Sequence, residues 1–283
     1  MQPLSTTNAR VGYPGREGAH SAAACDQLFP DARELVALSS FAAVADGVAT
    51  GEIAYGVLPI ESSLAGPVNE THDLLFDSAL AIVAETVLPI RHCLVGLPDA
   101  TIEAVRVVHS HPVALDQCRR LLARMPDATA IAAATTGDAA AHVAEHGDPS
   151  EAAIASERAA SLYGLAVLAD DVGDHPEAFT RFVSISTHVR LDVNGAPWRT
   201  AFSFATDHQP GALHRAIEPF ARHEIDLHQL VSRPIPATPW RYRFDAVLAG
   251  HPLDPVVRSA LAEVRARTRL LRVFGSYPAA VSP

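Results

Sequence analysis

The chain contains no lysine, and all 22 of its basic residues are arginines. This absence excludes Schiff-base chemistry, a pyridoxal phosphate anchor and the lysine of phosphate-binding loops. Cysteine is also scarce, because Cys25, Cys93 and Cys118 are odd in number and widely spaced, which indicates neither a disulfide framework nor a paired-cysteine zinc site. No apolar run is long enough to span a bilayer, and the N-terminus lacks a cleavable leader pattern, so we expect a cytoplasmic protein with no membrane partner.

Positive charge is not concentrated anywhere, and the net charge is −10. Phosphate backbones require a basic face, so we expect no nucleic-acid partner. Neither a G-x-G-x-x-G loop nor a G-x-S-x-G elbow occurs, which leaves nucleotide binding and serine hydrolysis of that type unsupported. The 283 residues, 48% of them hydrophobic, are enough for about two domains with real cores.

The first part of the sequence alternates strands and helices. Strand 34–38, helix 41–50 closed by Gly51, and strand 54–59 predict a parallel βαβ unit, and a second set runs through helices 112–123 and 136–146. The apolar stretch 80–97 is interrupted by polar residues and suits a strand that crosses between two lobes. Strand 165–168 is expected to cross back, which gives two hinged lobes with a cleft between them.

The C-terminal part follows a different order. Residues 188–197 contain Asn194, Gly195 and Pro197 and are typical of a linker. Strands 200–205, 225–233, 242–249 and 270–274 with helices 211–222 and 255–265 then give the βαββαβ order of a ferredoxin-like unit. An exposed sheet edge in such a unit favours self-association.

Polar residues at the ends of predicted strands are the candidates for a site. Ser21 is a plausible N-cap of helix 21–29, whose free amides could receive a carboxylate. Ser62 and Ser63 follow a buried strand at its carboxyl end, where ligands bind in open α/β sheets, and a helix cap would explain only one of them. Thr180 and Arg181 open an apolar strand, and both can face a ligand only at a strand end or bend.

The segment 142–146 spells H-x-x-E-H, the pattern of an inverted zinc peptidase motif. The spacing puts His142 and His146 on one helical face, but His146 also suits the negative end of a helix that stops at Gly147. No third ligand is evident after the motif, and His109 and His111 are expected to be loop residues. We therefore predict no metal site.

Several segments together resemble those of the prephenate dehydratases and the related arogenate dehydratases, over nearly the whole chain. Thr136 heads the equivalent of the STA helix of that family, and Thr180-Arg181-Phe182 matches its TRF signature. The other matching segments are Gly18-Ala19-His20-Ser21, Pro59-Ile60-Glu61-Ser62-Ser63, Arg91-His92-Cys93-Leu94, Ser110-His111-Pro112 and Ala153-Ile154-Ala155-Ser156.

The resemblance implies an α/β fold: a two-lobed, periplasmic-binding-protein-like catalytic domain over 9–188 and a ferredoxin-like ACT regulatory domain over 198–278. Lobe 1 would span about 9–88 and 168–188, and lobe 2 about 89–167. It also implies a carbon–oxygen lyase that converts prephenate to phenylpyruvate in phenylalanine biosynthesis without a cofactor. Thr180 would be catalytic, and the residues expected to bind substrate are Ser21, Ser62, Ser63, Thr136 and Arg181, with Arg181 on the side-chain carboxylate.

The resemblance further implies that phenylalanine binds between ACT units of a homodimer or homotetramer. The segments expected to bind it are Gly211-Ala212-Leu213 and Ser232-Arg233-Pro234. Ser62, Ala178 and Val113 replace residues usual in the family, which leaves prephenate and arogenate open as substrates, and Val231 replaces a glutamate next to the effector segment. A non-catalytic aromatic-acid sensor is the alternative of another class, against which the retained Thr180 argues.

Overall fold

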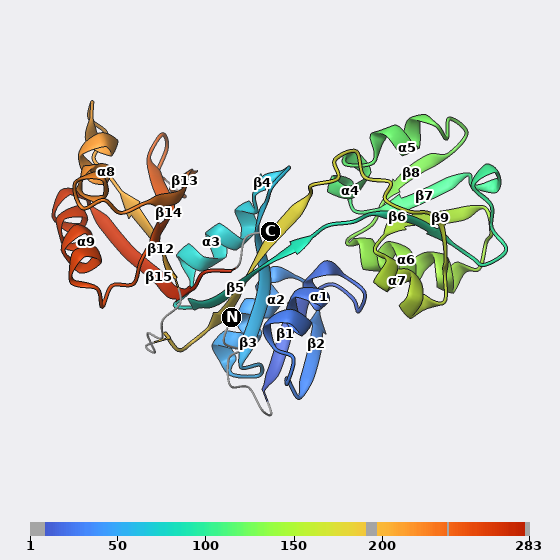
Figure 1. The fold of residues 1–283 in the computed structure, drawn as a ribbon, viewed down its shortest axis with the longest axis horizontal. Coiled ribbons are helices and arrows are strands. Elements are labelled where there is room, and N and C mark those ends of the chain that lie inside the picture. The colour runs from blue at the N-terminus through green and yellow to red at the C-terminus, as the bar shows by residue number, and fades with distance from the viewer. Residues whose placement is uncertain (1–8, 191–196, 237, 281–283) are drawn as a thin grey trace.

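The computed structural model describes residues 9–190, 197–236 and 238–280, and contains two α/β lobes followed by a third unit (Figure 1). Most of the predicted linker, including Asn194 and Gly195, lies outside these residues. Within them, no helix is long and apolar enough to cross a membrane.

Lobe 1 is built on a six-stranded sheet of order β2-β1-β3-β11-β5, with β4 beside β3. The predicted strands 34–38 and 54–59 are parallel, but β1, a strand that the sequence analysis did not predict, lies between them and is parallel to both. β11 is antiparallel to both of its neighbours. The strands are β1 Arg10–Pro14, β2 Glu34–Leu38, β3 Tyr55–Ser62, β4 Gly66–Pro67, β5 Ala81–Pro89 and β11 Phe179–Ser186, and the helices are α1 His20–Leu28, α2 Phe41–Thr50 and α3 Asn69–Asp77.

Helix α2 shows why local signals succeed in this lobe. The Ser40 hydroxyl accepts a hydrogen bond from the Ala43 amide and caps the helix, while Gly51 ends it in the left-handed region at φ 78°. Val44 and Val48, one turn apart, are fully buried in the core against the sheet. Caps and apolar spacing therefore agree on both bounds.

Lobe 2 has a five-stranded sheet of order β10-β6-β9-β7-β8. The predicted helix 112–123 is divided into two short helices at Gln117 and Cys118. The strands are β6 Cys93–Gly96, β7 Val107–Ser110, β8 Thr129–Ala132, β9 Glu151–Ala155 and β10 Ala166–Ala169, and the helices are η1 Ile102–Ala104, α4 Pro112–Asp116, α5 Arg119–Ala123, α6 Thr136–His146 and α7 Glu157–Tyr163.

The return crossing differs from the prediction. β10 pairs antiparallel with β6 and so belongs to the lobe 2 sheet, where it covers what would be an open edge. Residues 165–168 therefore do not cross between the lobes. The chain returns through residues 170–178, and lobe 1 resumes at β11 (Figure 1).

The third unit has the predicted βαββαβ order, with an antiparallel sheet of order β13-β14-β12-β15 that is ferredoxin-like. Its two helices pack on the sheet through a core that includes Phe202, Phe204 and Phe220. The elements are β12 Trp198–Ala205, α8 Ala212–Arg222, β13 Leu227–Pro234, β14 Tyr242–Ala249, α9 Pro255–Arg267 and β15 Leu270–Pro278.

The third unit is joined to lobe 1 by a shared core. Phe274 and Tyr277 of β15 are buried in the same cluster as Ile82 of β5. Gly275 makes this contact possible, because a Cβ atom at this position would lie 2.2 Å from the Ile82 carbonyl oxygen, and its φ of 146° also favours glycine. The unit is thus packed against lobe 1 and not merely tethered to it.

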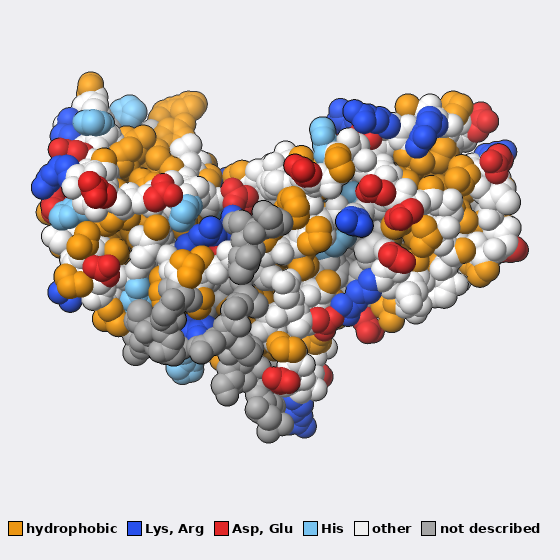
Figure 2. Space-filling view, in the orientation of Figure 1, with side chains coloured by type: hydrophobic (Ala, Val, Ile, Leu, Met, Phe, Trp, Pro, Cys, Tyr) orange, Lys and Arg blue, Asp and Glu red, His pale blue; other side chains and the backbone are white. Residues whose placement is uncertain are grey.

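The outer side of the third unit carries exposed apolar side chains. Leu230 lies on the edge strand β13, and Trp240 and Tyr242 lie on the turn and strand that follow, with Trp240 81% exposed. Hydrophobic side chains are also visible at the surface over this unit in Figure 2. An edge strand with exposed apolar residues is a surface that could pair with another chain.

Candidate active site

In each lobe, the carboxyl ends of the parallel strands lie at the same end of the sheet. In lobe 1, β1 and β3 run parallel and β3 ends at Ser62, while antiparallel β11 begins at the same edge because Thr180 pairs with Ser62. In lobe 2, β7 is parallel to both β8 and β9, so their carboxyl ends also share an edge. Such edges are where open α/β sheets bind ligands.

The loop between β1 and α1 brings these edges together. The Ser156 hydroxyl of lobe 2 donates to the Gly18 carbonyl at 3.2 Å, and the Tyr163 hydroxyl donates to the Glu17 carbonyl at 2.7 Å. A Cβ atom on Gly137 would lie 3.1 Å from the Ala19 amide nitrogen, so the start of α6 packs closely on this loop. The N-termini of α1 and α6 therefore meet between the lobes.

Ser21 and Thr136 lie in the first turns of these two helices, and each side chain is 8% exposed. The prediction that Ser21 is an N-cap is wrong, because α1 begins at His20 and its N-cap, Ala19, provides no side-chain hydrogen bond. The N-cap of α6 is Thr135, whose hydroxyl accepts from the Asp138 amide at 3.0 Å. Two helix N-termini in contact provide unpaired amides and partial positive charge, which suit a carboxylate.

Ser62 and Ser63 join the end of β3 to the start of β11. The Phe179 amide donates to the Ser63 hydroxyl at 2.9 Å, and the Ser63 amide donates to the Phe179 carbonyl at the same distance. The Ser62 hydroxyl accepts from the amides of the following turn at 3.2 and 3.3 Å. Both hydroxyls accept bonds in this way and retain a hydrogen to donate.

Thr180 is half-buried beside these serines. Among the residues that the structure describes, none forms a hydrogen bond with its hydroxyl. The structure thus brings Thr180 next to Ser62 and leaves it free to donate to a ligand.

Arg181 does not join this group. Adjacent strand residues point to opposite faces, and the Arg181 guanidinium lies 3.3 Å from the Glu61 carboxylate and 3.1 Å from that of Glu85. Burial would lower the pKa of Arg181, but Glu85 and Glu61 outweigh it and raise the pKa above its ordinary value. Contact between Arg181 and a substrate carboxylate stays a prediction from the sequence.

Two histidines that the sequence analysis did not assign lie at the junction of the lobes. His20 begins α1, and His92 lies on the chain crossing from β5 to β6, with ring centroids 6.0 Å apart at an angle of 88°. Burial, and then the neighbouring His92, lowers the pKa of His20 to about 4, and burial also lowers the pKa of His92. Both imidazoles are therefore neutral near pH 7.

His92 has one ring nitrogen engaged and one available. Its Nε2 lies 3.0 Å from Oε1 of Gln117, whereas Nδ1 is buried without a hydrogen-bond partner among the described residues. A buried, unpaired polar atom at such a junction is suited to a ligand. The sequence held a signal for both histidines, since each lies inside a segment matched to the dehydratases.

The predicted effector segments lie at the same end of the third sheet, after β12 and at the end of β13. Gly211 is the N-cap of α8 at φ 75° and provides no side-chain cap, while the Ala212 amide donates to the Gln209 carbonyl at 3.1 Å. Ser232, Arg233 and Pro234 end β13, and Arg233 is level with the end of β12, since both pair with Arg243. β14 separates the two segments within one chain.

Arg233 also connects the effector segment to lobe 1. Its guanidinium lies 2.5 Å from the carboxylate of Asp73 on α3, which Arg243 also contacts at 2.7 Å. Burial would raise the pKa of Asp73, but the hydrogen bonds from Arg243 and Arg233 hold it below its ordinary value. The predicted effector segment is thus linked directly to lobe 1 by the ion pair between Arg233 and Asp73.

Known proteins are similar to this chain over almost its whole length. A family model described as prephenate dehydratase matches residues 11–190. Arogenate dehydratase/prephenate dehydratase 2 of Arabidopsis thaliana is 34% identical over 281 residues, covering 96% of this chain and 73% of that protein. The solved prephenate dehydratase of Arthrobacter aurescens in complex with L-Phe is 30% identical, with 97% of this chain and 93% of that chain covered and a TM-score of 0.86. A solved structure described as GqqA, a novel type of quorum quenching acylase, is 33% identical over 97% of this chain and 98% of that chain, with a TM-score of 0.85.

Proposed function

The chain belongs to the prephenate dehydratase family, and we propose that it is a carbon–oxygen lyase that converts prephenate to phenylpyruvate, carbon dioxide and water. The observation that carries this proposal is the Thr180 hydroxyl, which forms no hydrogen bond with a described residue and lies opposite Ser62 at the carboxyl end of β3. The reaction would provide the carbon skeleton of phenylalanine. It requires no cofactor, because formation of the aromatic ring drives it.

The chemistry asks the protein to assist one leaving group. The bond between the ring and its carboxylate breaks and the electron pair enters the ring, while the C4–oxygen bond breaks and hydroxide departs with its electrons. Thr180 donates a hydrogen bond to this oxygen and offsets the charge that develops on it. A threonine hydroxyl has too high a pKa to give up its proton fully, so the proton that completes water comes from solvent.

The other polar groups hold the substrate. Unpaired amides at the starts of α1 and α6, with the Ser21 and Thr136 hydroxyls, would bind a carboxylate. Ser62 and Ser63 would fix β11 and the substrate beside Thr180. Closing of the two lobes on the ligand would exclude water from the reacting carbon.

For Arg181 we propose a positioning role in place of the carboxylate contact predicted from the sequence. Its guanidinium is shared between Glu61 and Glu85, on the side of β11 that faces the third unit. These contacts hold the strand that presents Thr180. The substrate carboxylates would then be left to the helix N-termini.

The test is turnover by the purified protein, followed through the phenylpyruvate formed from prephenate. Thr180→Ala should slow the reaction about a hundredfold or more at saturating substrate, as loss of an oxyanion-type donor does. Thr101→Ala is the matched control, because Thr101 is exposed and its side chain caps nothing. A Thr180→Ala rate within a few-fold of wild type would remove this residue from the mechanism, and tight binding without turnover would favour the aromatic-acid sensor.

Arogenate is the alternative substrate within the family. It carries an amino group where prephenate has a keto oxygen, and Ser62 and Ala178 replace asparagines that the family usually has near this site. Parallel incubation with arogenate, measured as phenylalanine formed, separates the two activities.

A second candidate function is hydrolysis of an acylated amine, which the similarity to the solved acylase favours, since its identity and coverage are at least those of the solved dehydratase from Arthrobacter aurescens. The same protein preparation incubated with N-acylated substrates would release free amine if this function holds. Dehydratase activity without amine release would reject it.

Regulation by phenylalanine is proposed from the third unit. We expect the amino acid to bind between the Gly211–Leu213 segment of one copy and the Ser232–Pro234 segment of another, in a homodimer or homotetramer. Support comes from the uncapped start of α8 and from β13, an edge strand with exposed Leu230. A cytoplasmic location is proposed with it.

A further inference from the structure

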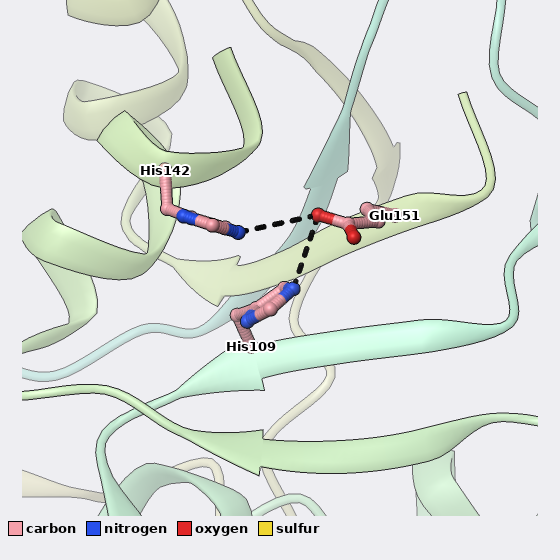
Figure 3. A group of neighbouring side chains, drawn as sticks. All are labelled: His109, His142 and Glu151. Carbon is pink, nitrogen blue, oxygen red and sulfur yellow. Dashed lines mark hydrogen bonds and ion pairs between the residues drawn. The ribbon is translucent and has the colours of Figure 1, made fainter. Parts of the chain in front are cut away.

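Three imidazoles and one carboxylate converge in lobe 2, away from the junction of the lobes. His109 lies on β7, His142 and His146 lie on α6, and Glu151 is the first residue of β9. Figure 3 shows His109 and His142 directed at the same carboxylate oxygen of Glu151 from different elements. The expectation that His109 is a loop residue is wrong, since β7 extends to Ser110 and the His109 side chain is buried.

The fold explains how residues so far apart in sequence meet. His142 and His146 are four residues apart and therefore stack on one face of α6, with ring centroids 5.5 Å apart. On the parallel pair β7 and β9, Glu151 is level with Val107, two residues before His109. Since strand residues two apart share a face, His109 and Glu151 both point toward α6.

The spacing of the ligand atoms suits one metal ion. His109 Nε2 and His142 Nε2 lie 3.2 and 3.4 Å from Oε2 of Glu151, and His146 Nε2 lies 3.8 Å from its Oε1. With zinc–nitrogen and zinc–oxygen bonds of about 2.0–2.1 Å, two ligands of a tetrahedral zinc are about 3.3 Å apart. One ligand atom from each of His109, His142 and Glu151 lies within 4.8 Å of the other two, and His146 belongs to a second such group with Asp148 and Glu151.

The charges around Glu151 also favour a bound cation. The Glu151 side chain is only 15% exposed, and its ion-pair partners among the described residues are all histidines, with no arginine. None of these described partners is a permanently charged side chain, and a divalent cation would provide a positive charge beside the carboxylate.

We propose that His109, His142 and Glu151 form a binding site for a divalent transition-metal ion, with zinc as the ion that fits two imidazoles and a carboxylate, and that His146 lies beside this site. Asp148, whose carboxylate lies within 4.8 Å of the ligand atoms of His146 and Glu151, would support the outer side of the site. The site depends on neither the proposed dehydratase reaction nor its substrate.

The role of this site is structural and not peptidase chemistry. In an inverted zinc peptidase motif the glutamate between the histidines is the general base, but here the Glu145 carboxylate is bound by Arg16 of lobe 1 at 2.9 Å. The metal would instead tie β7, α6 and β9 together. Arg16 also contacts Asp138 of the same helix at 3.1 Å, so the metal would hold a helix that bears contacts between the lobes.

The experiment uses the full chain without a histidine tag, stripped with a chelator and dialysed. Zinc chloride is titrated in competition with a chromophoric chelator, and melting temperature is measured with and without zinc. We expect one zinc per chain, a dissociation constant below about one micromolar, and a rise in melting temperature of about 5 °C at excess zinc. Cobalt should give the visible absorption of a four-coordinate ion.

Two variants and one control decide the outcome. His142→Gln should fold, because this side chain is half exposed, and it should weaken zinc binding at least about a hundredfold. Glu151→Gln should do the same and is checked for folding by circular dichroism. His214→Gln, on the exposed face of α8, should leave binding unchanged. Wild type that binds no zinc, or His142→Gln that binds it as well as His214→Gln, would overturn the proposal.

Discussion

Glu85 carries a buried negative charge that contacts arginines from both lobe 1 and the third unit. It lies in the middle of β5 and is 1% exposed, with Arg181 at 3.1 Å and Arg199 of the third unit at 2.5 Å. The Ala280 amide also donates to it at 2.8 Å. Glu85→Gln keeps the shape and removes the charge that both arginines share.

The burial of the partners sets the expected magnitude. Arg181 retains Glu61, but the Arg199 side chain is only 11% exposed and Glu85 is its ion-pair partner among the described residues. Breaking a buried pair by removing one partner costs about 3–5 kcal/mol. The retained hydrogen bonds of glutamine favour the lower end, about 3 kcal/mol. Spread over a chain of this size, that loss lowers the melting temperature by roughly 6–12 °C.

The assay is thermal unfolding by circular dichroism, with turnover measured on the same samples. Glu103→Gln is the matched control, because this glutamate is exposed, and it should melt with wild type. Activity at a temperature below both transitions should also fall, since Arg181 loses one of the two contacts that hold its strand. A Glu85→Gln protein that melts within about 2 °C of the control would refute the view that this carboxylate joins lobe 1 to the third unit.

Four further outcomes are expected. Arg181→Lys should lower both the melting temperature and the turnover number, because an ammonium cannot bridge two carboxylates as a planar guanidinium does. A raised Michaelis constant with nothing else changed would instead support the prediction that Arg181 binds a substrate carboxylate. Ser62→Asn made with Ala178→Asn should change the ratio of prephenate to arogenate turnover, and an unaltered ratio would place both outside the substrate contacts. Phenylalanine at millimolar concentration should raise the melting temperature of the wild type, and the absence of a shift would contradict phenylalanine binding. Val231→Glu should lower the dissociation constant for phenylalanine by about one to two decades, the worth of one charge-assisted hydrogen bond, and an unchanged constant would contradict the role given to position 231. Gly275→Ala should destabilise the protein by about 2–4 kcal/mol in denaturant titrations, because its Cβ would meet the β5 backbone, and a loss below about 0.5 kcal/mol would show that the strands can separate freely.

The sequence was sufficient where helix-ending glycines and apolar spacing agreed. The bounds of α2 and α6 were predicted correctly because Gly51 and Gly147 end these helices in the left-handed conformation. The βαββαβ order of the third unit followed from alternating patterns and turn residues. Each of these features depends on neighbours within a few positions.

Other missed features depend on pairings between distant segments. Residues 166–169 are apolar enough for either role, and only the open edge of β6 decides that they stay in lobe 2. Thr180 and Arg181 are adjacent in sequence, but the face that each takes depends on β3 and β5. Glu151 is 42 positions from His109, so nothing local could indicate that they share a face.

The place of β11 in the first sheet also determines the order in which the protein can be assembled. β11 lies between β3 and β5, yet more than 80 residues separate it from β5 in the chain, and those residues build lobe 2. During synthesis on the ribosome, the sheet of lobe 1 therefore lacks its strand between β3 and β5 until all of lobe 2 has been synthesised. The strand that closes the gap is the one that carries Thr180, so the reactive hydroxyl takes its place only when the sheet is complete.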